Sequence, residues 1–118
     1  MIWFLNGNKS LSTKARKAIE SNVATNFVSI VSLWEFAIKI SLDRLDLKTS
    51  FENIGEEITD NNFQMLPITF QDILILSSLP FHHRDPFDRL LISQGINNKF
   101  TIISQDEYFE SYKVKVLW

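Results

Sequence analysis

Residues 27–40 have the sequence FVSIVSLWEFAIKI, and this stretch decides the class of fold. Its first five residues, 27–31, are β-branched or aromatic apart from one serine, which predicts a buried strand. Ser32 then resembles a helix N-cap with Glu35 three residues later, and apolar side chains follow on nearly every face up to residue 40. The stretch therefore predicts a strand followed at once by a largely buried helix.

The rest of the chain repeats this alternation of strand and helix. Asp85 and Pro86 mark one helix start, because proline suits the first helical position, and Thr69 with Asp72 forms a capping box at another. Alternating elements favour a parallel α/β sheet with helices on both faces. The predicted helices cover 12–21, 32–40, 51–60, 69–78, 86–97 and a turn at 106–110, and the predicted strands cover 27–31, 63–68, 101–104 and 113–118.

Length and composition exclude several classes of protein. The 118 residues suit a single domain, residues 1–118, and 45% hydrophobic residues suffice for a core. The chain has no cysteine, which excludes disulfides and thiolate metal sites and favours the cytoplasm. It has no apolar run long enough for a membrane span, and its net charge of −2 means that any nucleic-acid contact must be local.

Three acidic residues follow strands or begin helices where α/β proteins place their functional groups. These are Glu35 after strand 27–31, Asp88 in the first turn of helix 86–97, and Asp106 after strand 101–104. Carboxylates without thiols suit a hard cation such as Mg²⁺ or Mn²⁺. Such a site implies hydrolysis of phosphodiester bonds by a positioned water.

Basic side chains near these carboxylates are candidates for holding further phosphates, namely Lys39, Arg84 and Arg89. Zinc is disfavoured because His82 and His83 are adjacent and have no thiolate partners, and both are interpreted as loop residues. No glycine-rich phosphate loop or nucleophile elbow occurs, so nucleotide-binding and serine-hydrolase classes are excluded.

Each acidic residue also has a purely structural interpretation. Glu35 would complete a capping box with Ser32, and Asp85 would cap helix 86–97. Asp88 would be favoured by the helix dipole, and Asp106 would cap a short surface helix. The residues alone leave these interpretations open beside the catalytic one.

Three segments together resemble the PIN-domain ribonuclease toxins of VapC type. They are residues 32–39, SLWEFAIK, residues 79–94, LPFHHRDPFDRLLISQ, and residues 101–106, TIISQD, with the closing VLW at 116–118. The resemblance covers essentially the whole chain, and HHRDPFDRLL is its most specific part. It implies a three-layer α/β/α sandwich with a parallel sheet, and carboxylates that bind Mg²⁺ or Mn²⁺ and cut RNA.

The resemblance also assigns roles to individual residues and implies partners. It makes Glu35, Asp88 and Asp106 metal ligands and catalytic residues, and Asp85 a second-shell or alternative ligand one turn before Asp88. It implies a cognate antitoxin protein and an RNA substrate, and apolar residues at 2–5 and 33–40 are candidates for antitoxin or homodimer contacts.

One part of the family pattern has no counterpart in this sequence. Family members open with a central strand that ends in an aspartate, whereas this sequence begins with residues that resemble the segment after it. We therefore expect the first, central strand of the sheet and its aspartate to be missing. We also expect the chain to be poorly stable alone and at best weakly active, because unpaired strands and a lost ligand are both costly.

The leading hypothesis is a metal-dependent endoribonuclease that acts as the toxin of a toxin–antitoxin pair. The alternative is a catalytically impaired PIN-like binding module that engages an antitoxin or RNA without cleaving it. A purely structural domain with incidental carboxylates is a third hypothesis. Loss of RNA cleavage on chelation of the metal separates the first hypothesis from the others.

Overall fold

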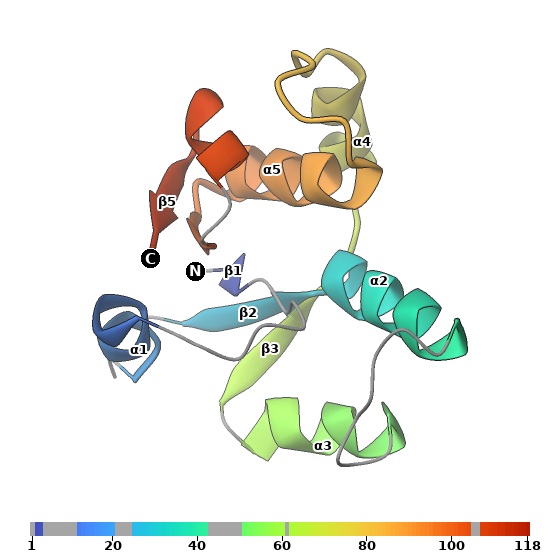
Figure 1. Ribbon diagram of the computed structural model, residues 1–118, viewed down its shortest axis with the longest axis vertical. Helices are drawn as coiled ribbons and strands as arrows, with labels where there is room; N and C mark the ends of the chain where they lie inside the picture. The colour runs from blue at the N-terminus through green and yellow to red at the C-terminus, as the bar shows by residue number, and fades with distance from the viewer. Residues whose placement is uncertain (1, 4–11, 21–24, 43–50, 61, 105–106) are drawn as a thin grey trace.

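The computed structural model describes residues 2–3, 12–20, 25–42, 51–60, 62–104 and 107–118, which form an α/β fold (Figure 1). Its five strands make one sheet in the order β3-β2-β1-β4-β5, and every neighbouring pair is parallel. The α/β class and the parallel sheet are thus confirmed. The strands are β1 (Ile2–Trp3), β2 (Asn26–Ser29), β3 (Phe63–Leu66), β4 (Thr101–Ile103) and β5 (Lys115–Leu117).

The expectation that the central strand is missing is wrong for this structure. The two-residue β1 lies between β2 and β4 and pairs with both, with Ile2 opposite Phe27 and Ile102. Its β-branched and aromatic residues suit a strand, and its backbone supplies partners that β2 and β4 would otherwise lack. The sequence has no acidic residue before Glu20, so no aspartate follows this strand.

Helices cover the sheet on both sides, with α4 and α5 on one side and α1 and α3 on the other (Figure 1). This arrangement agrees with the predicted three-layer sandwich. No helix in the described part of the chain is long and apolar enough to cross a membrane. The helices are α1 (Thr13–Glu20), α2 (Ile30–Ser41), α3 (Phe51–Asp60), α4 (Phe70–Ser77), α5 (Pro86–Asn98) and the 3₁₀ helix η1 (Glu107–Ser111).

The start of α2 differs from the prediction, and the difference matters for Glu35. The N-cap is Ser29, whose hydroxyl oxygen accepts a hydrogen bond from the Val31 N–H at 3.1 Å. Because Ser29 satisfies this N–H, the helix begins at Ile30, and Ser32 is buried inside its first turn. The capping box of Ser32 and Glu35 is therefore wrong, and Glu35 lies in the middle of α2.

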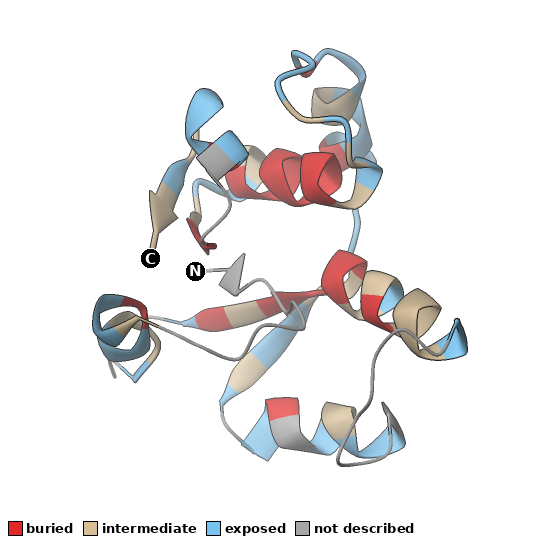
Figure 2. Cartoon of the chain, in the orientation of Figure 1, coloured by how far each residue is buried: buried red, intermediate tan, exposed pale blue. Residues whose placement is uncertain are grey.

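Most of helix α5 is buried, from Asp88 to Gly95 (Figure 2). Its Gln94 is fully buried, accepts a hydrogen bond from the Ser29 hydroxyl at 2.5 Å and donates to the Pro67 carbonyl at 3.1 Å. Gln94 thus joins α5 to the ends of β2 and β3. On α4, the predicted capping box of Thr69 and Asp72 is confirmed.

Candidate active site

The first turn of α5 presents two carboxylates because of how that helix begins. Asp85 has an extended backbone, and its Oδ1 accepts hydrogen bonds from the N–H groups of Phe87, at 2.8 Å, and Asp88, at 3.2 Å. Pro86 fills a position where no N–H donor is required. The predicted N-cap is therefore confirmed, and it sets Asp88 in the first turn, where the helix dipole favours negative charge.

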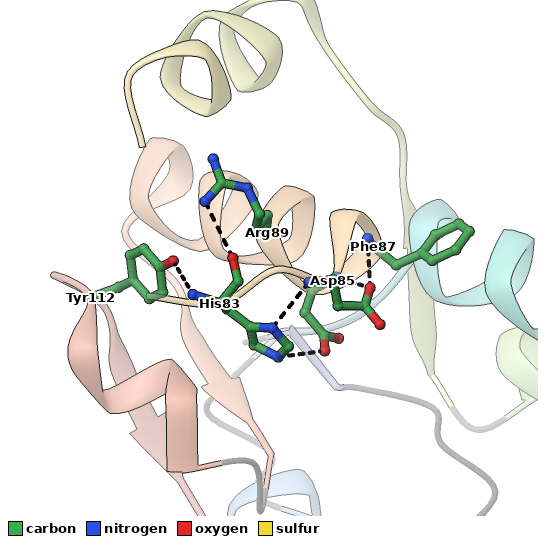
Figure 3. Close-up of polar contacts among 6 residues, drawn as sticks. His83, Asp85, Phe87, Arg89 and Tyr112 are labelled. Atoms are coloured by element: carbon green, nitrogen blue, oxygen red, sulfur yellow. Dashed lines mark hydrogen bonds and ion pairs between the residues drawn. The ribbon is translucent and has the colours of Figure 1, made fainter. Parts of the chain in front are cut away.

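Asp88 is buried and makes a close contact with His83 in the preceding loop. The Nε2 of His83 lies 2.9 Å from Oδ2 of Asp88, and the two side chains are 13% and 9% exposed. The other ring nitrogen of His83, Nδ1, accepts a hydrogen bond from the backbone N–H of Asp85 at 3.2 Å (Figure 3). The imidazole therefore bridges the N-cap and the buried carboxylate.

Glu35 of α2 comes close to the same helix start. Burial is the main cause that raises the pKa of Glu35, Asp85 raises it further, and Lys39 one turn along α2 lowers it. Helix α2 is held against α5 by Trp34, whose ring packs edge-on against Phe87 at 4.7 Å between centroids. The chain thus brings a partly desolvated Glu35 near Asp85. The convergence of Glu35 with Asp88 and Asp106 stays a prediction.

The donor set at this place consists of oxygen atoms, which suits Mg²⁺ or Mn²⁺. The Oε1 atom of Glu35 is buried and has no hydrogen-bond partner among the described residues, so a bound cation would satisfy it. No three acidic or histidine side chains in the described residues are close enough together to form a complete metal site. The predicted ligand Asp106 lies outside the described residues.

Comparison with known proteins identifies the family. The family model of the PIN domain matches residues 1–115. The chain belongs to the PIN-domain family. No curated protein matches the sequence. Among solved structures, the PIN-domain chain is similar to one in "Structure of FitAB bound to IR36 DNA fragment", with a TM-score of 0.66 and 12% identity over 98% of this chain and 92% of that chain. At that identity the likeness shows the fold.

The three basic residues predicted to hold phosphates lie in different settings in this PIN domain. Lys39 is half-buried on α2 near Glu35, and Arg84 is exposed between His83 and Asp85. Arg89, in contrast, is 6% exposed, and its guanidinium donates to the carbonyls of Leu79, Pro80 and His83. Arg89 supports the loop that carries His83, so a phosphate contact by Arg89 stays a prediction with no support in this structure.

Two residues that shape the PIN-domain site have no assigned role in the sequence analysis. His83 was interpreted only as a loop residue, and Tyr112 was not singled out. The Tyr112 hydroxyl accepts a hydrogen bond from the His83 N–H at 2.8 Å and donates to the Pro80 carbonyl at 2.7 Å. The signal in the sequence was the position of His83 two residues before Asp85 and five before Asp88, since a largely buried imidazole needs partners for both ring nitrogens.

Proposed function

We propose that this PIN domain is a metal-dependent endoribonuclease that acts as the toxin of a toxin–antitoxin pair. Mg²⁺ or Mn²⁺ would be held by Glu35, Asp88 and Asp106, with Asp85 as an outer or alternative ligand. The observation that carries the proposal is Glu35: its side chain is half-buried near Asp85, its pKa is raised, and its buried Oε1 has no hydrogen-bond partner among the described residues. Such a group is stabilised by a cation.

The chemistry follows from the charges around this place. The metal would position a water for in-line attack on a phosphodiester and neutralise charge on the phosphate oxygens. Lys39 and the exposed Arg84 flank the acidic residues and would bind the phosphates on either side of the scissile bond. The acidic residues themselves would repel RNA, so metal and basic side chains are both required for binding.

RNA cleavage by the full chain tests this function. A single-stranded RNA should be cut with Mg²⁺ or Mn²⁺ present, remain intact in EDTA, and remain intact with the Asp88→Asn variant. Glu52→Gln, which changes an exposed carboxylate on α3, is the matched control and should leave cleavage unchanged. Cleavage that persists in EDTA, or in Asp88→Asn, would overturn the proposal.

The partner and substrate are part of the same proposal. A cognate antitoxin that covers the acidic residues would block cleavage, and co-expression with the product of the adjacent gene tests for it. The similar structure of FitAB contains a DNA fragment, so a DNA strand of the same base sequence is the informative second substrate. We expect the chain to act in the cytoplasm, and a homodimer is the oligomer that the family resemblance implies.

A binding module without cleavage is the second candidate, and two observations favour it. Strand β1 is followed by no acidic residue in the sequence before Glu20, and the described carboxylates do not form a complete metal site. Such a module would bind RNA or an antitoxin but leave RNA intact at every Mn²⁺ concentration. An electrophoretic shift without cleavage, unchanged by Asp88→Asn, would identify it.

A further inference from the structure

His83 is held in one orientation by contacts to both of its ring nitrogens. Because Nδ1 accepts the Asp85 N–H, the proton of the neutral ring lies on Nε2, the nitrogen that faces Asp88 Oδ2 at 2.9 Å. The hydrogen-bond network therefore assigns the tautomer. In this tautomer, His83 Nε2 donates to Asp88 Oδ2.

The rest of His83 is fixed by its surroundings (Figure 3). Its N–H donates to the Tyr112 hydroxyl, and its carbonyl accepts from the Arg89 guanidinium at 3.4 Å. Its ring packs against Tyr108 and Phe109 of η1, with centroids 5.2 and 6.1 Å away. His83 thus touches both α5, which carries Asp88, and the helix that follows Asp106 in the sequence.

We propose that His83 is a positioning residue: it donates from Nε2 to Asp88 and so fixes the orientation of this carboxylate before a cation binds. The inference rests on the proposed function, in which Asp88 ligates the metal. Asp85 is oriented by two backbone N–H groups, and Oδ2 of Asp88, one turn further along α5, is contacted by the His83 side chain. Hydrogen-bonded partners of this kind typically change metal affinity by about 10–100-fold.

Two substitutions separate this role from simple support of the loop. In His83→Gln, the amide nitrogen lies as many bonds from Cβ as Nε2 does, so donation to Asp88 is retained. In His83→Asn, the amide oxygen replaces Nδ1 and still accepts the Asp85 N–H, but the side chain is too short to reach Asp88. A positioning role predicts that Gln is the milder change, and a loop-supporting role predicts that Asn is.

Binding of Mn²⁺ to the full chain, measured by calorimetry, is the test. We expect the affinity of His83→Gln to remain within about 3-fold of wild type and that of His83→Asn to fall by about 10–100-fold. Cleavage of RNA should show the loss in kcat at a fixed Mn²⁺ concentration, with little change in KM. His82→Asn, which changes the exposed neighbouring histidine, should match wild type.

The outcomes distinguish failure of the proposed function from failure of the role proposed for His83. A wild-type chain that binds no Mn²⁺ and cuts no RNA defeats the proposed function. Wild-type binding with equal affinity in His83→Gln and His83→Asn, or with His83→Gln the weaker of the two, defeats only the role of His83. Urea unfolding of both variants establishes that the affinities compare folded proteins.

Discussion

Replacement of Arg89 by methionine should destabilise the fold, because the guanidinium is the main polar support of the loop before α5. It donates to the Pro80 carbonyl at 2.8 Å, to the Leu79 carbonyl at 3.1 Å and more distantly to the His83 carbonyl, and it stacks on the Phe81 ring at 3.9 Å. Arg89→Met keeps the apolar stem and removes only the guanidinium.

The expected size follows from these contacts. A hydrogen bond from a charged group contributes about 1.5–3 kcal/mol, but Pro80 is exposed, so water would replace part of the loss there. We therefore expect the free energy of unfolding to fall by about 2–3 kcal/mol in total. For a chain of this length, about 2.1 cal/mol/K per residue converts this loss to a decrease in Tm of roughly 8–12 °C.

Urea unfolding followed by circular dichroism measures the change, with Arg84→Met as the matched control on an exposed arginine. The midpoint for Arg89→Met should decrease at unchanged slope, and the free energy of unfolding of Arg84→Met should stay within about 0.5 kcal/mol of wild type. Arg89→Lys should recover only part of the loss, because an ammonium lacks the planar fork. Wild-type stability in Arg89→Met with a raised KM for RNA would refute this reasoning and make Arg89 a phosphate contact.

Four further substitutions test other parts of the structure. Glu35→Gln should stabilise the metal-free protein near neutral pH, because burial raises the pKa of Glu35 and its ionisation then costs stability. The gain in Tm should shrink as the pH falls toward about 4, and a gain that does not depend on pH would contradict this. Gly95→Ala should destabilise the fold, since an added Cβ would lie 2.8 Å from Val114 Cγ2. Gly55→Ala should instead stabilise it by about 0.5–1 kcal/mol, because its added Cβ lies 3.7 Å from the nearest neighbour. A lower free energy of unfolding in urea for Gly55→Ala than for Gly95→Ala would contradict this packing. Tyr112→Phe removes the hydroxyl between His83 and Pro80 and should cost about 1–3 kcal/mol; an unchanged urea midpoint would mean that water replaces it fully.

The parts of the fold that were predicted correctly from the sequence are formed by residues close to one another in the chain. Asp85 before Pro86, and Thr69 three residues before Asp72, form caps that need no distant partner, and the structure contains both. The start of α2 could not be located in this way, because Ser29 and Ser32 are both good caps. The choice depends on where β2 ends, and β2 ends where its pairing with β3 ends, at Ser29 opposite Leu66.

In the candidate site, too, features set by local sequence were predictable and those set by tertiary contacts were not. The position of Glu35 just after β2 was predictable, because parallel strands direct their carboxyl ends to one edge of the sheet, but its proximity to Asp85 was not among the predictions. The structural role of Arg89 could not be predicted, because a guanidinium beside acidic residues is as suitable for a phosphate as for carbonyl groups. Its true partners, among them Leu79 ten residues earlier, depend on the path of an irregular loop. His83 was missed for the same reason.

The acidic side chains at the start of α5 have an electrostatic cost, which explains why several hydrogen bonds hold them. Burial penalises the charge of Glu35 most, and repulsion by Asp85 adds to this penalty, so a flexible carboxylate would turn toward water. The N-cap bonds of Asp85 and the His83 contact of Asp88 restrict this escape. The folded chain therefore keeps negative charge concentrated at this place, and the divalent cation that we propose would relieve the repulsion when it binds.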